Sequence, residues 1–204
     1  MPFETRTEFR TDDEGVNAYR LLTAVVVPRP IAWVTTLSDE GVVNLAPHSF
    51  YTVACANPPI VQFTSVGGKD TLRNVRATGE FVISLAHGPL IEAVNNSSAA
   101  FAADESEPAQ LGITMEPSRS VRPPRVADSP VSLECTLHST NELGDSTVVL
   151  GNVVTITVAD AVLVDGHPDY ELLDPLARLG RNEWGVGATV TSLDRPSTPD
   201  DIDD

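Results

Sequence analysis

PRPIAWVTT at residues 28–36 and NLAPHSFY at residues 44–51 are the two stretches that decide the fold of this chain. The first is rich in β-branched and aromatic residues, which favour strands, and Pro28 and Pro30 confine its start to an edge or a bend. The second alternates small, polar and aromatic residues, and a polar turn at residues 37–43 separates the two. The pair predicts a hairpin whose inner edge meets a ligand rather than another layer of core.

Short strands punctuated by turns make up most of the remaining pattern. We expect about seven strands, a number typical of a β-barrel or sandwich with added helices. Short helices are predicted at 15–24, from Asp70 to Gly79, after Pro89 and at 174–180. Residues 25–27 are expected to enter the first strand, and residues 42–53 to form an extended segment broken at Pro47. The fold class is therefore mainly β.

The chain shows no internal repeat, and its organisation is predicted as a single domain with two flanking segments. Residues 1–14 are expected to form an arm, residues 15–190 the domain, and residues 191–204 an acidic, disordered and solvated tail. Inside the domain, residues 97–130 form a long excursion with one short helix at 109–112. Long loops in compact domains are often functional or docked on a partner.

Composition and charge limit the classes of function. The chain has 204 residues, 41% of them hydrophobic, and a net charge of −16 that argues against nucleic-acid or anionic-membrane binding. No apolar run is long enough to span a bilayer, and the first residues lack a secretion signal. Cys55 and Cys135 form no C-x-x-C pair and are interpreted as free thiols of a reducing compartment, so a cytoplasmic location is expected.

Several familiar kinds of site are missing from the sequence. There is no G-x-S-x-G elbow and no G-x-G-x-x-G after a strand. No histidine stands at metal-ligand spacing from another ligand, so no metal site is expected. Gly68-Lys69 is followed by Asp70 where a P-loop requires Ser or Thr, and Phe63 stands where its earlier glycine would be.

An anion site of another kind is predicted around Lys69. Gly67 and Gly68 permit close backbone approach, and the helix that follows offers free N–H groups and the positive end of its dipole. Lys69 adds a charge, and Ser65 and Thr71 add hydroxyl groups. The alternative is a plain N-capped helix after a loop. Arg29 could pair with the same anion, or it could be an exposed arginine at a sheet edge.

Three further residues are singled out by their chemistry. His48 is a weak candidate for catalysis, and the alternative is a structural residue or a ligand contact. Trp33 is expected in the core. Trp184 either stacks over a flat ligand or packs against its neighbours.

Taken together in their order, these motifs resemble the flavin-reductase-like family of FMN-binding split barrels, in the subgroup with PRPIAWVTT and N-L-A-P-x-S-[FY]-[FY]. The similarity extends over residues 15–185. It includes, besides the two opening stretches, Asn57-Pro58-Pro59, residues 69–74, Gly79 to Val82, residues 129–135 and Pro175 to Gly180.

The resemblance implies a Greek-key split barrel that dimerises and binds FMN non-covalently near the dimer interface. It implies that Asn44, Leu45, Ala46, Pro47, His48 and Ser49 border the isoalloxazine ring, with Thr35 and Thr36 beside it. It also implies that Ser65, Lys69, Asp70 and Thr71 hold the phosphate end, which is where the residues alone predict an anion.

The family chemistry implied is hydride transfer from NADH or NADPH to the flavin, which then serves an oxygenase or another acceptor. The cofactor performs the difficult step, and the protein supplies orientation and hydrogen bonds. Many family reductases carry a G-D-H stretch, whereas this chain has Ser146 at the place of the histidine. Arg181 and Trp184 also replace a small residue and a tyrosine of the family.

Two alternative functions are kept open. One is an electron carrier that binds FMN without an efficient nicotinamide site, which the absent histidine favours. The other is a structural or interaction protein on a barrel that has lost its cofactor, against which the intact motifs argue.

Overall fold

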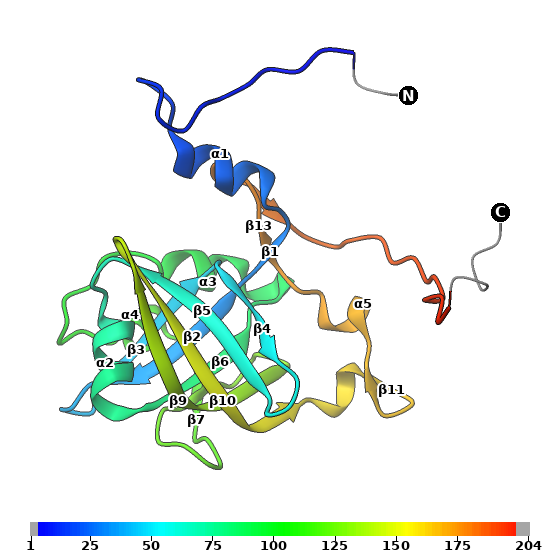
Figure 1. The fold of residues 1–204 in the computed structure, drawn as a ribbon. Coiled ribbons are helices and arrows are strands. Elements are labelled where there is room, and N and C mark those ends of the chain that lie inside the picture. The colour runs from blue at the N-terminus through cyan, green and yellow to red at the C-terminus, as the bar shows by residue number, and fades with distance from the viewer. Residues whose placement is uncertain (1–3, 199–204) are drawn as a thin grey trace.

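A seven-stranded antiparallel sheet curls into the barrel that forms the body of the molecule (Figure 1). The computed structural model describes residues 4–198. Along the sheet the strands lie in the order β3-β2-β6-β9-β10-β5-β4. Their bounds are β2 (Ala32–Leu37), β3 (Val43–His48), β4 (Tyr51–Cys55), β5 (Ile60–Val66), β6 (Glu80–Leu85), β9 (Val131–Leu143) and β10 (Ser146–Val158).

The barrel closes where the chain passes from β3 to β4. These two strands lie at opposite ends of the strand order, yet only Ser49 and Phe50 separate them in the sequence. The backbone N–H of Thr64 in β5 donates to the carbonyl of Phe50 at 2.8 Å, and His48 Nδ1 lies 3.4 Å from the Thr64 carbonyl oxygen. This closure confirms the predicted fold, a mainly β split barrel with few short helices.

Alternate residues of β2 face two different hydrophobic clusters, as the two-residue period of a strand requires. Ala32 and Val34 point into the barrel, where they pack with Phe63, Phe81 and Val149, among others. Trp33 points the other way, into a second cluster that contains Leu45, Val94 and Leu176. Trp33 is fully buried, which agrees with its expected place in the core.

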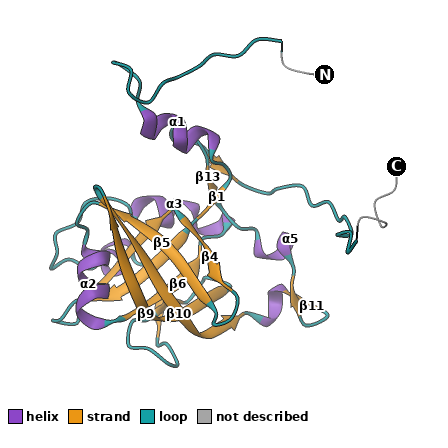
Figure 2. Cartoon of the chain, in the orientation of Figure 1, coloured by secondary structure: helices purple, strands orange, loops and turns teal. Residues whose placement is uncertain are grey.

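Short helices and two-residue strands surround the barrel (Figure 2). A three-stranded sheet, β1-β13-β14, lies where α1 meets the barrel. The longest described helix has nine residues, whereas a membrane-spanning helix needs about 20, so none in residues 4–198 could cross a bilayer. The peripheral elements are α1 (Ala18–Val25), β1 (Arg29–Pro30), α2 (Asp70–Thr78), the 3₁₀ turn η1 (Gly88–Leu90), α3 (Ile91–Asn96), α4 (Glu107–Leu111), β7 (Met115–Glu116), β8 (Arg125–Val126), η2 (Asp160–Val162), β11 (Leu163–Val164), β12 (His167–Pro168), α5 (Tyr170–Leu173), β13 (Ala177–Arg178) and β14 (Trp184–Gly185).

Two predicted elements differ in the structure. The helix α1 extends through Val25, so residues 25–27 do not enter a strand. The predicted helix at 174–180 is absent from that described segment: α5 ends at Leu173, and Ala177–Arg178 form β13 between β1 and β14. Long-range strand pairing overrides the local helical pattern there.

Other boundaries shift for local reasons. Pro47 lies inside β3 and does not break it, because β3 is an edge strand that can lack one N–H donor. The α2 helix ends as predicted at Gly79, whose φ of 71° favours glycine. The helix expected at 109–112 lies at Glu107–Leu111 and ends at Gly112.

The flanking segments and the cysteines complete the description. Residues 4–14 are exposed, and residues 191–198 contain no helix or strand. The rest of the predicted arm and tail, residues 1–3 and 199–204, lies outside the described residues. Both thiols are free, and burial raises the pKa of Cys135 to about 12.

Candidate functional site

Three adjoining cavities meet around Pro47, next to the closure of the barrel. Their volumes are about 140, 170 and 270 Å³, and all three share Pro47 as a lining residue. Ser49, Lys69 and Ser98 each line two of them. We call the three together the Pro47 groove. Its combined size falls in the range of small-molecule pockets, about 300–1,000 Å³.

The start of α2 supplies the positive side of the Pro47 groove. Lys69 is the N-cap residue and forms no side-chain capping bond, while the first N–H groups of a helix have no partner within it. Lys69 is exposed, is the chain's one lysine, and forms no ion pair within residues 4–198. A cationic side chain beside a helix N-terminus suits a phosphate group.

Asn44 is the centre of a buried polar network beneath the groove. Its Oδ1 accepts hydrogen bonds from Thr71 Oγ1 at 3.0 Å and from Thr36 Oγ1 at 3.2 Å. Its Nδ2 donates to Glu107 Oε1 at 2.7 Å, and Asn74 Nδ2 donates to Thr36 Oγ1 at 3.1 Å. Because every one of these polar groups is buried, the bonds fix Asn44 between β2, β3 and α2.

His48 is held in the wall of the Pro47 groove as a neutral ring. Its Nε2 lies 3.3 Å from Thr71 Oγ1, and its ring centroid lies 4.8 Å from that of Phe63. Burial, and then the nearby Lys69 charge, lower the pKa of His48 to about 4, against a weaker opposing effect of the Thr64 carbonyl. A neutral imidazole at pH 7 is a poor proton donor, which favours the structural or ligand-contact interpretation.

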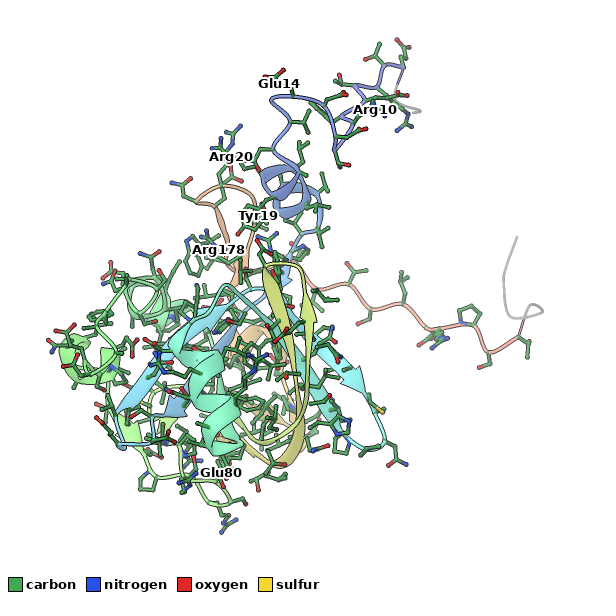
Figure 3. All side chains as sticks on the ribbon, turned by 60° about the vertical axis from the view of Figure 1, so that its left-hand side comes forward. Arg10, Glu14, Tyr19, Arg20, Glu80 and Arg178 are labelled. Carbon is green, nitrogen blue, oxygen red and sulfur yellow. The ribbon has the colours of Figure 1, made fainter. Side chains whose placement is uncertain are left out.

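Trp184 and Arg178 border the far side of the groove. The Arg178 guanidinium carbon lies 4.6 Å from the centroid of the Trp184 ring, a cation–π contact. Figure 3 labels Tyr19 on α1 and Arg178 in the region where this helix meets the barrel. Tyr19 also lines the cavity that contains His48 and Lys69.

The Pro47 groove brings together nine of the fourteen residues predicted to bind the cofactor. They come from β3 and the bend after it, from the start of α2, and from β14 near the end of the domain. They are Asn44, Ala46, Pro47, His48, Ser49, Lys69, Asp70, Thr71 and Trp184.

Four of the other five predicted residues are buried next to the groove without lining any of its three cavities. Thr36 acts on the groove through Asn44, and Ser65 Oγ donates to the Gly67 carbonyl at 3.3 Å. Thr35 is fully buried, and its Oγ1 has no hydrogen-bond partner among the residues described. Leu45 packs in the Trp33 cluster.

Arg29, the fifth, is only 7% exposed, so its interpretation as an exposed edge arginine is wrong. Its guanidinium donates to the carbonyls of Thr23, Val26 and Leu179, and it lines a separate cavity beside α1. These bonds tie the end of α1 to the C-terminal part of the domain.

The 97–130 excursion contributes groove residues that the motifs did not predict. Residues 97–101 and Glu107 line the same cavity as Lys69 and Thr71. The only signal in the sequence was the unusual length of the excursion, which indicated a function without indicating which residues carry it.

The residues around the groove fit a ligand with an anionic end and a flat ring. Lys69 and the first N–H groups of α2 would hold the anion. Residues 46–49 and the Trp184 ring would border the planar part. The Asp70 carboxylate lies in the same cavity as Lys69 and pairs with Arg73 at 2.6 Å.

The family model described as "Flavin reductase like domain" matches residues 24–173, and the chain belongs to that family.

Similar proteins extend the match over nearly the whole chain. The uncharacterized protein BH2278 of Halalkalibacterium halodurans is 43% identical over 191 residues, covering 88% of this chain and 91% of that protein. The structure of nitrilotriacetate monooxygenase component B from Bacillus cereus matches with a TM-score of 0.85 at 28% identity, over 93% of this chain and 100% of that one. The structure of Pseudomonas fluorescens 2-nitrobenzoate 2-nitroreductase NbaA matches with a TM-score of 0.85 at 27% identity, over 94% of this chain and 97% of that one.

Proposed function

We propose that this protein is an FMN-binding oxidoreductase of the flavin reductase type, which transfers a hydride from NADH or NADPH to FMN bound in the Pro47 groove. The observation that carries the proposal is the position of Lys69 and the α2 N-terminus. They border the same groove as residues 46–49, so one molecule could reach both.

The chain's own residues would bind and orient the cofactor. Lys69 would pair with the phosphate, with the N–H groups at the start of α2 adding to it. Pro47, His48 and Ser49 would border the ring, and Trp184, which packs against the Trp33 cluster and carries the Arg178 guanidinium over its ring, would border its far side. Bound FMN would supply the hydride-accepting chemistry, and the groove residues would control how a donor approaches it.

Homodimer formation is part of the proposal. The helix α1 projects from the barrel in Figure 1, and none of its residues is buried. Tyr19, Leu22 and Val25 of this helix are between 57% and 72% exposed, so a second copy could cover an apolar helix face.

The reduced flavin would serve an oxygenase or another electron acceptor. The Bacillus cereus protein is by its name one component of a monooxygenase, which is the kind of partnership proposed for this chain. A cytoplasmic location fits the two free thiols.

An electron carrier without an efficient nicotinamide site is the second candidate. Ser146 pairs with Val66 across β10 and β5, so it lies next to the loop that leads to Lys69. Its Oγ donates to Asp145 Oδ1 at 2.8 Å. If a histidine at this position assists binding or reaction of the nicotinamide, Ser146 cannot replace it. FMN would then bind without being reduced rapidly.

One experiment separates these functions. The purified protein is mixed with FMN, freed of unbound flavin, and treated with NADH or NADPH without oxygen while the visible flavin absorbance is followed. Rapid bleaching, faster than that of free FMN under the same conditions, supports the reductase. A yellow protein that does not bleach supports the carrier. A protein that takes up no FMN contradicts both and favours a structural or interaction protein.

A further inference from the structure

Glu107 is a buried carboxylate that reaches the groove from the long excursion. It lies at the start of α4, is 5% exposed, and lines the cavity that contains Lys69 and Thr71. Its Oε1 accepts from Asn44 Nδ2 at 2.7 Å, and its Oε2 accepts from the backbone N–H of Leu45 at 2.9 Å. The Glu107 side chain therefore binds both the Asn44 side chain and the backbone of β3.

The two bonds match the ionised form of Glu107. Each oxygen of a carboxylate accepts, whereas a protonated carboxyl would turn one oxygen into a donor that faces an N–H group. Burial raises the pKa of Glu107, and the Asp70 charge adds to this effect. The bonds from Leu45, from its own backbone N–H and from Asn44 act in the opposite direction. A buried charge is tolerated only when such bonds are made.

The excursion has a second anchor at its beginning. Trp33 Nε1 donates to Ser97 Oγ at 2.9 Å, and Ser97 Oγ donates to the Val94 carbonyl at 3.0 Å. Both groups of this contact are buried. Residues 98–101, which form one wall of the groove, therefore lie between two fixed points: Ser97, which is bonded to Trp33 of β2, and Glu107, which is bonded to Asn44 and Leu45 of β3.

We propose that Glu107 is a positioning residue of the cofactor site, which fixes the Asn44 amide and holds residues 98–101 against the bound FMN. This inference rests on the proposed FMN binding and adds a residue outside the motifs of the family resemblance. Glu107 acts through Asn44: with Nδ2 held by the carboxylate, Oδ1 must face Thr71 and Thr36. Thr71 is thereby oriented at the start of α2, beside Lys69.

Substitution of Glu107 by Gln tests this role with little change in volume. The Gln side chain has one oxygen, so its NH₂ group would face either Asn44 Nδ2 or the Leu45 N–H. Glu105→Gln is the matched control, because Glu105 is exposed in the same excursion and its Oε2 accepts from the Ala102 N–H, at 3.0 Å, away from β3. Asn44→Ala and the E107Q/N44A double variant complete a double-mutant cycle.

The readout is the FMN dissociation constant from equilibrium titration, measured beside the unfolding midpoint of each variant. We expect E107Q to raise the dissociation constant about tenfold or more, and E105Q to leave it within about twofold. In the N44A background E107Q should have little further effect, because the two residues act as a unit. If Glu107 contributed only to stability, E107Q would lower the unfolding midpoint but would leave the FMN dissociation constant unchanged. The double-mutant cycle would then show no coupling in FMN binding.

The outcomes separate the two proposals. If the wild-type protein binds FMN and E107Q binds it with equal affinity, the positioning role of Glu107 is overturned and the proposed function is not. Wild-type protein that does not bind FMN overturns the proposed function and this inference with it. If E107Q does not fold, the same measurement is made on Glu107→Asp. This variant keeps the negative charge, but its side chain is one methylene shorter, so the carboxylate lies farther from Asn44 and Leu45. Wild-type affinity of E107D would then overturn the positioning role.

Discussion

The imidazole Nε2 of His48 lies 3.3 Å from Thr71 Oγ1, and this contact joins the end of β3 to the first turn of α2. On the other side of the ring, Nδ1 lies 3.4 Å from the Thr64 carbonyl oxygen in β5. One imidazole ring is thus in contact with three elements at the closure of the barrel.

Stability should depend on pH through His48. Its native pKa of about 4 lies below the ordinary value of 6.5, so between these values the unfolded chain binds more protons. The contribution of His48 is fully present above pH 6.5 and is lost as pH falls toward 4, by up to about 3 kcal/mol. His48→Gln should remove this part of the pH dependence of the unfolding free energy.

Urea unfolding at several pH values measures this effect. His138→Gln is the control, because His138 is an exposed histidine of β9 that lines none of the three cavities of the groove. The raised pKa of Glu107 acts with the opposite sign, and comparing variants at each pH cancels it. Equal pH dependence of wild type and H48Q would show that His48 does not carry the effect.

Lys69→Ala should weaken FMN binding through the loss of a charge-assisted contact, on the order of 1.5–3 kcal/mol. The difference should shrink with added salt, because Lys69 is exposed. Arg76→Ala removes a positive charge from the last turn of the same helix and serves as the control. An unchanged dissociation constant for K69A at low salt would remove Lys69 from the site.

Ser97→Ala should destabilise the protein by about 1–3 kcal/mol, because the buried Trp33 Nε1–H loses its acceptor. Ser98→Ala, at an exposed neighbouring serine, should have little effect. Denaturant unfolding of both variants gives the comparison. Equal loss of stability in the two would contradict the importance of the Trp33 contact.

Arg29→Lys should loosen α1, because one ammonium group cannot reproduce a planar guanidinium that reaches the carbonyls of Thr23, Val26 and Leu179. Faster amide hydrogen exchange in residues 18–25 is the expected result, measured by mass spectrometry. Arg119→Lys, at an exposed arginine, is the control. Unchanged exchange in this helix would show that Arg29 does not hold it.

Local patterns predicted the barrel well where neighbouring residues determine the structure. The strand 32–37 alternates between two buried faces, and Gly79 ends α2 because it accepts a positive φ. The loop at Gly67 to Lys69 precedes a helix start in the structure as in the prediction. Each of these features depends on residues within one turn or one strand.

Contacts between distant segments explain what the local patterns could not predict. Glu107 meets Leu45 across 62 positions, and Arg29 meets Leu179 across 150. No local pattern indicates such partners. The strand at Ala177–Arg178 has the same origin, since its pairing with β1 and β14 overrides a helical pattern.

Protection of Lys69 by FMN tests the central claim most directly. Because Lys69 is the one lysine of the chain, an amine-acetylating reagent has two targets, this side chain and the amino terminus. Acetylation is followed by mass spectrometry with and without FMN, and the amino terminus serves as the internal control. If FMN binds in the Pro47 groove, it should slow acetylation of Lys69 and leave that of the amino terminus unchanged. Equal acetylation of Lys69 with and without saturating FMN would contradict this placement.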